Sequence, residues 1–249
     1  LLSSESILYF DMDDYESIAS MFSEDLSVHG GISIKGSKRI SPPQTKDDIP
    51  KNGIVLCSLD STDLCQQHGK EAYKLEVNSN CILLQGGSPR GIFYGTRTLL
   101  QMIMSIEPIH SIHSNNSHPS STILPIPAIA IIDYPKFPWR GLHLDVSRHM
   151  FPLLFLKKYV DLIAFHKLNT FHWHLTDDQG WRLEINGFPE LMEVGSQRDG
   201  TPIPTNINES DHKPYGGYYT QDEVRELVAY AKERFITIVP EIEMPGHAV

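Results

Sequence analysis

Residues 141–178 read GLHLDVSRHMFPLLFLKKYVDLIAFHKLNTFHWHLTDD, and this stretch decides the fold. Two short apolar runs, Gly141–Val146 and Thr170–Thr176, flank a segment that begins at Pro152. Within that segment the apolar residues Leu153, Leu156, Val160, Ile163 and Ala164 recur at the spacing of one helix face. The pattern predicts a strand, a helix and a second strand, in that order.

The same alternation continues toward the C-terminus. Thr220 and Glu223 have the spacing of a capping box, in which each side chain satisfies a backbone N–H of the other at the start of a helix. A β-branched run over 236–239 then predicts a third strand, which ends at Pro240. Alternating strands and helices with continuously apolar strands are typical of a parallel sheet or barrel. We therefore expect an α/β domain over residues 126–249 that contains about three barrel strands.

The first half of the chain has a different pattern. Ala72–Val77 alternates apolar and polar residues, and a turn at 78–80 precedes a second apolar run, which together predict a hairpin. Ser88 followed by Pro89 predicts a helix start, because proline has no N–H to leave unsatisfied in the first turn. A segment rich in Ser, Asn, His and Pro over 107–127 reads as a linker. We expect a small α+β domain over residues 1–125.

Composition excludes several classes of protein. The chain has 249 residues, 40% hydrophobic and 21% charged, with a formal net charge of −10. Such an acidic surface repels nucleic acid phosphates, so no nucleic-acid partner is expected. The apolar run over 123–132 is broken by prolines and is shorter than the about 20 residues that a membrane span needs. Three cysteines, Cys57, Cys65 and Cys81, argue against a disulfide framework and predict reduced thiols.

Polar residues follow each predicted barrel strand. In a (β/α) barrel these strand ends form the active face. Carboxylates with one guanidinium and one imidazole suit sugar hydrolysis, in which carboxyl groups handle protons. The same face also suits a metal, because His172, His174, Asp177 and His247 are all candidate ligands. The polar residues after the three strands are Asp145 and Arg148, then Asp177 and Asp178, then Glu241, Glu243 and His247.

Four strings make the resemblance to one family specific. They occur in the order of glycoside hydrolase family 20, the β-N-acetylhexosaminidases, and the resemblance covers nearly everything from about residue 126 onward. The predicted hairpin and the helix at Pro89, with GIFYG over 91–95, are similar to the small α+β domain that precedes the barrel in that family. The strings are WRGLHLDVSRH (139–149), KLNTFHWHLTDDQGWR (167–182), YGGYYT (215–220) and PEIEMPGH (240–247).

The resemblance implies substrate-assisted catalysis, in which the 2-acetamido carbonyl of the sugar attacks the anomeric carbon. In the family, an adjacent Asp-Glu pair after the fourth barrel strand orients the acetamido group and protonates the leaving oxygen. The sequence ends at Val249, just past the third strand, and contains no equivalent of that pair. Residues 136–249 are fewer than half of the about 250 that such a barrel needs. We expect a truncated barrel that is inactive by itself and requires the remainder of the barrel as its partner.

The resemblance also implies roles for individual residues. Arg148 matches the arginine that holds hydroxyls of the terminal sugar, although an ion pair with Asp145 is the alternative. Asp177 and His247 match a dyad behind the general acid, where the carboxylate fixes the imidazole tautomer. Glu243 stands where the family usually carries Asp and belongs to the same expected network.

Other matched positions are expected to be structural. Arg140, His172, Trp173 and His174 read as packing or hydrogen-bonding residues of the barrel interior, and Trp181 as a candidate for lining the pocket.

The expected function is removal of terminal β-linked N-acetylglucosamine or N-acetylgalactosamine from a glycoconjugate or chitin-type oligosaccharide, with no metal and no organic cofactor. A catalytically inactive carbohydrate-binding protein and a metal-dependent barrel hydrolase are the alternatives. The resemblance implies a secreted, periplasmic or lysosomal location. Asn115 and Asn208 begin glycosylation triplets. The sequence leaves open whether the protein forms a homodimer.

Overall fold

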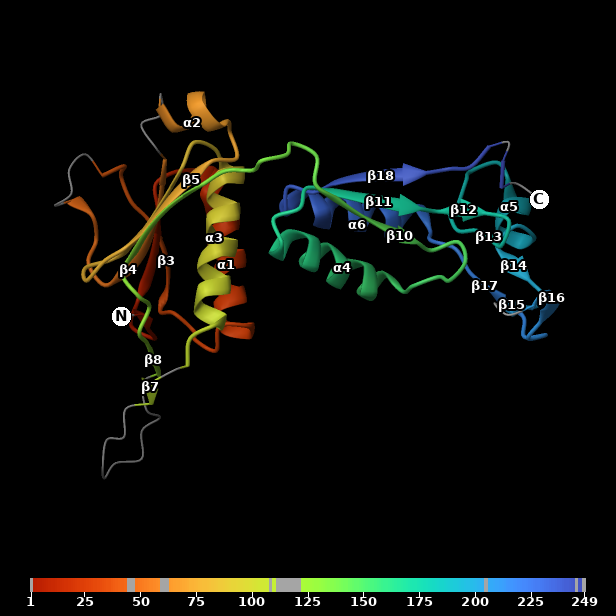
Figure 1. The fold of residues 1–249 in the computed structure, drawn as a ribbon, viewed down its shortest axis with the longest axis horizontal. Coiled ribbons are helices and arrows are strands. Elements are labelled where there is room, and N and C mark those ends of the chain that lie inside the picture. The colour runs from red at the N-terminus through yellow and green to blue at the C-terminus, as the bar shows by residue number, and fades with distance from the viewer. Residues whose placement is uncertain are drawn as a thin grey trace. The chain divides into compact units, whose positions relative to one another are not determined.

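The computed structural model describes residues 2–43, 48–58, 63–107, 109–110, 122–203, 206–244 and 246–247. The chain forms two compact units, Leu1–Pro138 and Trp139–Val249, and each is described by itself (Figure 1).

The first unit is built on a six-stranded sheet in the order β3-β2-β4-β6-β5-β9. Strands β3, β2, β4 and β6 are parallel, whereas β5 and β9 run antiparallel to their neighbours. The two long helices, α1 and α3, contact each other and pack against the sheet (Figure 1). The elements are β2 (Ile7–Phe10), α1 (Glu16–Val28), β3 (Gly36–Arg39), β4 (Gly53–Ser58), β5 (Tyr73–Val77), β6 (Ile82–Gly86), α3 (Pro89–Met104) and β9 (Ile129–Asp133).

Smaller elements complete this unit. A three-stranded antiparallel sheet has the order β1-β8-β7. Part of the predicted linker therefore forms strands, whereas Asn115 lies outside the described residues. These elements are β1 (Leu2–Ser3), a 3-10 helix (Asp13–Tyr15), α2 (Asp63–His68), β7 (Ile109–His110) and β8 (Thr122–Leu124).

The predicted hairpin and helix are both present. Asn78 Oδ1 accepts the backbone N–H groups of Asn80 at 2.8 Å and Cys81 at 3.0 Å, which makes the turn between β5 and β6. Ser88 caps α3, because its Oγ accepts the N–H of Gly91 at 3.3 Å and Pro89 follows it. The three cysteines are free thiols, and burial raises the pKa of Cys57 to about 12.

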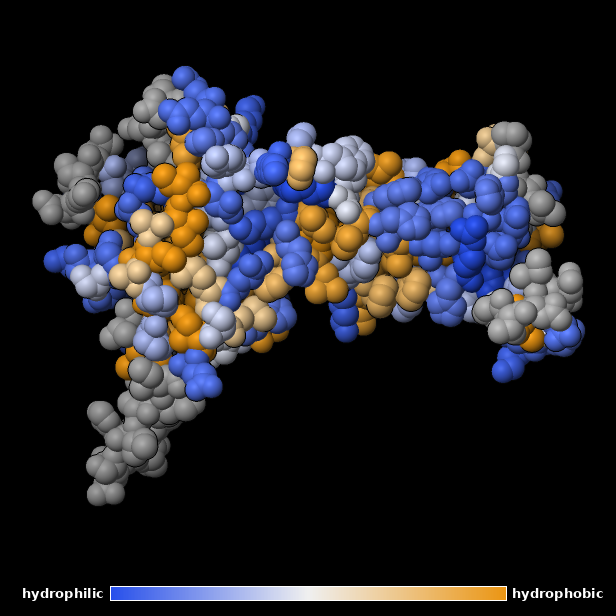
Figure 2. All heavy atoms as spheres, viewed as in Figure 1, coloured by the Kyte–Doolittle hydropathy of each residue, from blue (hydrophilic) through white to orange (hydrophobic). Residues whose placement is uncertain are grey.

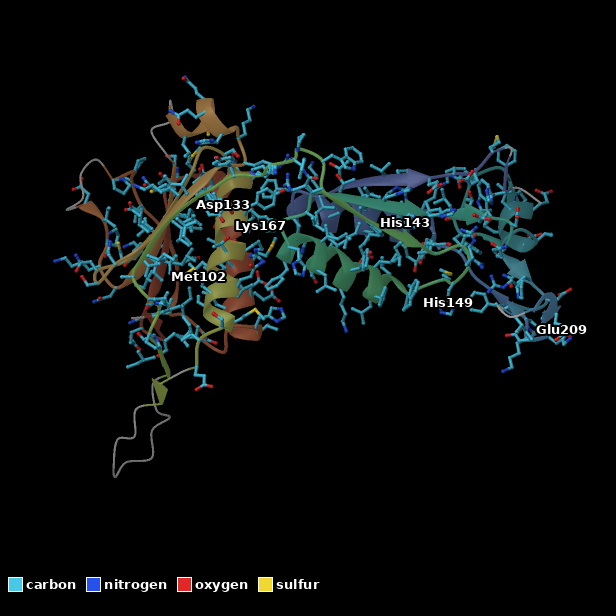
Figure 3. The ribbon with its side chains drawn as sticks, viewed as in Figure 1. Met102, Asp133, His143, His149, Lys167 and Glu209 are labelled. Carbon is cyan, nitrogen blue, oxygen red and sulfur yellow. The ribbon has the colours of Figure 1, made fainter. Side chains whose placement is uncertain are left out.

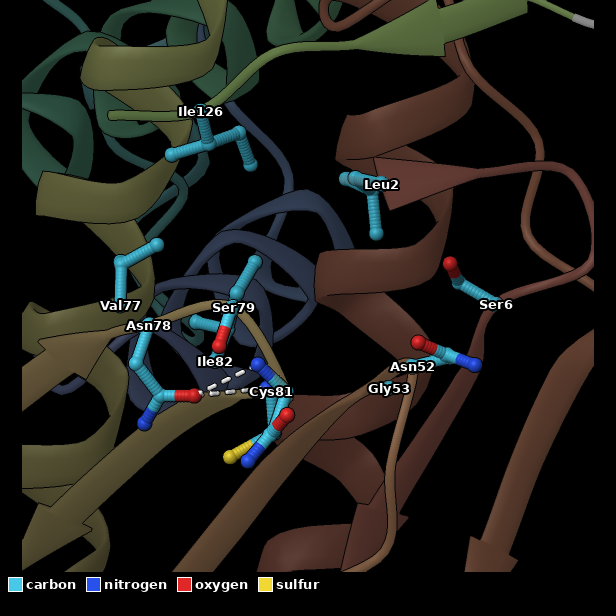
Figure 4. Close-up of a pocket in the computed structure, with 11 residues that line it drawn as sticks. Leu2, Ser6, Asn52, Gly53, Val77, Asn78, Ser79, Cys81, Ile82 and Ile126 are labelled. Carbon is cyan, nitrogen blue, oxygen red and sulfur yellow. Dashed lines mark hydrogen bonds between the residues drawn. The ribbon is translucent and has the colours of Figure 1, made fainter. Parts of the chain in front are cut away.

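A small cavity lies beside this turn and is lined by Asn78, Asn52 and Ser6 among others (Figure 4). Its volume of about 20 Å³ accommodates about one water molecule. This cavity is therefore too small for a sugar.

The division between the units corrects the predicted boundary at residue 125. Strand β9 pairs with β5 from Val77↔Ile129 to Tyr73↔Asp133, and the Tyr73 hydroxyl donates to Asp133 Oδ2 at 2.6 Å. Residues 126–138 therefore belong to the first unit and not to the barrel. The predicted boundary was too early, because the strand partner of β9 lies more than 50 residues earlier in the chain.

The second unit contains three parallel strands with β11 in the centre. Helices α4 and α6 contact each other, and both contact strands of this sheet. Leu156, Val160 and Leu227 of these helices are buried, as are Phe171 and Trp173 of β11. These elements lie where periodicity predicted them: β10 (Gly141–Asp145), α4 (Leu153–Phe165), β11 (Thr170–His174), α6 (Gln221–Glu233) and β18 (Thr237–Glu241).

The loops of this unit contain short pairs of strands. They are β12 (Thr176–Asp177) with β13 (Gly180–Trp181), β14 (Gln197–Arg198) with β17 (Tyr215–Gly216), and β15 (Pro202–Ile203) with β16 (Asn206–Ser210), and the remaining helix is α5 (Pro189–Glu193). Asn208 of the second glycosylation triplet lies in β16.

Helix α4 presents apolar side chains at the surface of the second unit (Figure 2). Leu154 is 67% exposed and Leu162 is 55% exposed. None of the described helices is both long enough and apolar enough to cross a bilayer.

The predicted capping box at the start of α6 is present, with Thr220 Oγ1 accepting the Glu223 N–H at 3.2 Å and Glu223 Oε2 accepting the Thr220 N–H at 2.8 Å. We expect Thr220→Ala to lower the free energy of unfolding by about 1 kcal/mol, because the Glu223 N–H loses its acceptor, Thr220 Oγ1. Denaturant titration of the full-length protein measures this, with Thr220→Ser as the matched control. Equal losses in the two variants would show that the cap is not the cause.

Candidate active site

Arg148 lies just after β10 and directly precedes His149, which is labelled in Figure 3, and the Arg148 guanidinium binds three side chains. Nη1 lies 2.8 Å from Asp145 Oδ2, Nη2 lies 2.7 Å from Asp177 Oδ2, and Nε donates to Gln179 Oε1 at 2.8 Å. The Arg148 side chain stays 44% exposed, whereas that of Asp177 is only 2% exposed. The guanidinium is therefore fixed by carboxylates and still reaches solvent.

The charges at Arg148 stabilise one another. Burial alone would lower the pKa of Arg148, but the hydrogen bond with Asp145 and the nearby carboxylates outweigh it and raise the pKa. Burial alone would raise the pKa of Asp145, but the Arg148 backbone N–H and guanidinium outweigh it and lower the pKa. Both groups are thus held in their charged forms.

Asp177 also contacts two imidazoles. His247 Nδ1 lies 3.1 Å from Asp177 Oδ1, and His174 Nε2 lies 3.2 Å from Oδ2. Because a carboxylate only accepts, the bond to His247 requires the proton on Nδ1 and leaves Nε2 of the neutral ring as an acceptor. The sequence predicted this contact between Asp177 and His247, and the role of the pair remains a prediction.

Glu243 lies beside Glu241 and His174, and its part in the network behind the general acid remains a prediction. Its backbone N–H donates to Thr176 Oγ1 at 2.8 Å, and a carboxylate oxygen of Glu243 lies within 4.8 Å of ligand atoms of His174 and Glu241. Glu243 therefore contributes to the Asp177–His247 pair indirectly, because its backbone binds Thr176, the residue that precedes Asp177 in β12.

A second group of polar side chains, on β10, β11 and β18, lies on the sheet face that also carries Asp145. Glu241 Oε2 lies 2.5 Å from His172 Nε2, and the His143 and His172 rings meet edge to face with centroids 4.6 Å apart. Burial, followed by the neighbouring imidazoles of His172 and His174, lowers the pKa of His143. Burial alone would raise the pKa of Glu241, but the hydrogen bonds with Glu243 and His172 outweigh it and lower the pKa.

The four metal ligands considered from the sequence do not form one group. In the described part of the chain, His172 groups with His143 and Glu241, His174 with Glu241 and Glu243, and Asp177 with Asp178 and His247. Within each group, one candidate ligand atom from each residue lies within 4.8 Å of those of the other two. The hypothesis of one metal centre built from His172, His174, Asp177 and His247 therefore lacks its geometry.

Other residues matched to the family divide into structural and polar roles. Trp173 is 1% exposed and packs on Tyr219 at a centroid distance of 4.9 Å. Arg140 Nε donates to the Lys167 carbonyl at 2.9 Å, away from the carboxyl ends of the strands. Trp181 Nε1 donates to the Leu183 carbonyl at 2.5 Å, within its own loop. His172 contacts Glu241, and His174 contacts Asp177 of the site, whereas the sequence predicted packing or hydrogen bonding in the barrel interior for both.

Two arginines, Arg182 and Arg198, which sequence reasoning missed, hold the loops of the site. Arg182 is fully buried and donates to the carbonyls of Ser196 at 2.6 Å, Gly217 at 2.9 Å and Ser147 at 3.0 Å. Burial, followed by the nearby Arg198, lowers the pKa of Arg182. These acceptors are backbone carbonyls and leave no pattern in the sequence.

Arg198 directly holds the segment that carries Arg148. Its Nη2 donates to the Arg148 carbonyl at 2.9 Å and its Nη1 to the Gln179 carbonyl at 3.1 Å. Its guanidinium also lies 4.5 Å from the centroid of the Tyr215 ring. The backbone that bears Arg148 and the one that bears Gln179 are thus joined by one side chain.

We expect Arg182→Met to lower the free energy of unfolding by about 2–4 kcal/mol, because several buried carbonyls lose their donor together. Denaturant titration of the full-length protein measures the change. The matched control is Arg225→Met, since the Arg225 side chain is 68% exposed and its loss costs little. Equal stability of the two variants would contradict the role given to Arg182.

Comparison with known proteins identifies the family. The catalytic-domain model of glycosyl hydrolase family 20 matches residues 137–249, and the model of domain 2 of that family matches residues 1–134. The chain belongs to glycosyl hydrolase family 20. Its second unit is accordingly the first part of a family 20 TIM barrel, as predicted.

Individual family 20 proteins are similar over most of this chain. The beta-hexosaminidase of Porphyromonas gingivalis is 43% identical over 182 residues, which are 72% of this chain and 21% of that protein. The beta-hexosaminidase of Vibrio furnissii is 40% identical over 201 residues, which are 81% of this chain and 30% of that protein. The chain thus spans less than a third of the length of either relative.

A solved family 20 structure has the same fold. The exo beta-N-acetylglucosaminidase of Vibrio harveyi, crystallised with N-acetylglucosamine, is 30% identical with a TM-score of 0.74. The match covers 99% of this chain and 34% of that one. Both units described above therefore occur in a larger family 20 enzyme.

Proposed function

We propose that the full-length protein removes terminal β-linked N-acetylglucosamine or N-acetylgalactosamine from glycoconjugates or chitin-type oligosaccharides. The observation that carries this proposal is the fixed Arg148, which Asp145 and Asp177 hold at 2.8 Å and 2.7 Å while its side chain remains 44% exposed. A charged, pre-oriented guanidinium that reaches solvent suits the hydroxyls of a sugar. Membership of family 20 supports the substrate class.

The proposed reaction is retaining and substrate-assisted. The acetamido carbonyl oxygen forms a bond to the anomeric carbon as the bond to the aglycone oxygen breaks, and a general acid gives that oxygen a proton. Water then attacks the anomeric carbon of the oxazolinium ring and gives a proton to the carboxylate that the general acid left behind, the ring C–O bond breaks, and the β-configured sugar is released. The family resemblance places the general acid after the fourth barrel strand, which lies beyond the three strands described here.

The residues of this chain have supporting roles in the proposal. Arg148 binds sugar hydroxyls, and Asp177 fixes both the guanidinium and the His247 ring. The Nε2 acceptor of His247 then adjusts the proton affinity of the general acid. The family resemblance extends the proposal to a secreted, periplasmic or lysosomal location.

Chromogenic substrates test the proposal in the full-length protein. We expect turnover of 4-nitrophenyl β-N-acetylglucosaminide or its galacto epimer, and none of 4-nitrophenyl β-glucoside, which lacks the acetamido nucleophile. NMR should show the β-anomer as the first product, and added chelator should leave the rate unchanged. Binding of the sugar without turnover would favour the inactive carbohydrate-binding protein, and a rate abolished by chelator would favour the metal-dependent hydrolase.

A further inference from the structure

A histidine-rich group in the second unit takes no part in the proposed reaction. Side chains alternate along a strand, so His143 of β10, His172 and His174 of β11, and Glu241 of β18 share one face of the sheet. His143 is registered directly opposite His172, and His174 opposite Glu241. Strands that are distant in sequence thus bring three imidazoles and a carboxylate together.

The donor atoms of three of these residues are close enough for one ion. One ligand atom from each of His143, His172 and Glu241 lies within 4.8 Å of the other two. Two imidazole nitrogens with one carboxylate oxygen are the donor set of many zinc sites that keep a fourth position open. Hard cations such as Mg²⁺ and Ca²⁺ prefer oxygen atoms for all their ligands. Two nitrogen ligands and one oxygen ligand therefore favour a cation of intermediate hardness.

We propose that His143, His172 and Glu241 bind one zinc ion, which joins β10, β11 and β18. The ion would take the place of the proton between His172 Nε2 and Glu241 Oε2; this proton leaves to solvent and His172 Nδ1 takes up another, so that the ring binds zinc as a neutral imidazole. Two ligands of a tetrahedral zinc ion lie about 3.3 Å apart, since each bond is about 2.0–2.1 Å long. The present 2.5 Å separation of these two atoms therefore has to open by less than 1 Å.

His174 stands next to this group in a tautomer that suits a fourth ligand. Its Nε2 lies 2.9 Å from the Thr176 carbonyl, which only accepts hydrogen bonds. Nε2 therefore carries the proton, and Nδ1 of the neutral ring has a lone pair that can bind a metal. Nδ1 lies 3.9 Å from Glu241 Oε2. Histidine ligands usually donate their second N–H to a carbonyl or carboxylate in this way, which orients the ring.

Direct titration tests the site with Zn²⁺ as the probe. The full-length protein, free of any polyhistidine tag, is treated with chelator, dialysed and titrated with ZnCl₂ in a calorimeter. We expect one ion per chain at this site, and an apparent affinity at least about tenfold weaker in His143→Ala and in His143→Gln. The glutamine variant keeps the side-chain volume, and circular dichroism before titration shows that each variant is folded.

Matched controls separate this site from the other donor groups. His166→Ala removes an exposed histidine at the end of α4 and should leave zinc binding unchanged. Asp178→Asn removes a ligand of the Asp177, Asp178 and His247 group and should also leave it unchanged. Anomalous scattering from zinc-soaked crystals should place the ion between His143 and His172. Absence of binding, equal affinity in the His143 variants, or a loss caused by Asp178→Asn would each overturn the proposal, and none of them bears on glycosidase activity.

Discussion

Replacing Arg148 with alanine is expected to lower kcat/KM for a chromogenic N-acetylhexosaminide by at least about 100-fold. A charge-assisted hydrogen bond to substrate is worth about 1.5–3 kcal/mol, and the Arg148 fork offers more than one. The variant also leaves the Asp177 carboxylate, 2% exposed, without its guanidinium partner. Steady-state kinetics of the full-length protein measure the loss.

The matched control for this prediction is Arg225→Ala. The Arg225 side chain is 68% exposed on α6 and pairs with Asp222, so its removal should leave the kinetics unchanged. Arg148→Lys should recover only part of the activity, because one ammonium group cannot reproduce the planar fork that binds Asp145, Asp177 and Gln179. A folded Arg148→Ala protein with nearly normal kcat/KM would refute the assignment of Arg148 to the sugar.

Asp177→Asn is expected to lower kcat by about 10²- to 10⁴-fold. The amide nearly keeps the shape of the carboxylate, but its NH₂ group meets donors on Arg148, His174 or His247. Without the carboxylate, nothing fixes the proton of His247 on Nδ1. The His247 ring then no longer adjusts the pKa of the general acid. Initial rates at saturating substrate measure kcat, and Asp222→Asn on the exposed surface of α6 is the control.

A double variant separates a catalytic pair from a structural one. If Asp177 and His247 act as a unit, adding His247→Gln to Asp177→Asn should reduce kcat little beyond the single change. The pH profile of kcat should also change its acid limb in each variant, a readout that loss of packing alone does not give. Fully additive losses with unchanged pH profiles would show that the two residues act separately.

Local patterns in the sequence predicted the elements of the second unit well. Strands β10, β11 and β18 and helices α4 and α6 lie where apolar periodicity and the capping box at Thr220 place them. These signals are local, because each depends on residues within a few positions of one another. The same holds for the β5–β6 hairpin, whose turn is made by Asn78.

Features that depend on distant partners were harder to predict. Residues 129–133, which form β9, were assigned to the barrel domain, because their pairing with β5 involves residues much earlier in the chain, such as Tyr73, which lies 60 positions before its partner Asp133. Arg182 and Arg198 bind backbone carbonyls, and a carbonyl is present at every residue, so no spacing reveals the acceptor. The contact between Asp177 and His247 spans 70 positions and was expected only from the family resemblance.

The pairing of β9 with β5 decides where a recombinant first unit should end. An expression product that stops at residue 125 would lack β9 and leave the backbone of β5 unpaired along the edge of the sheet. An unpaired edge recruits strands from other chains, so that product should aggregate. A product that ends at Pro138 keeps β9, together with the bond from the Tyr73 hydroxyl to Asp133, and is the better choice for crystallisation or for exchange between homologues.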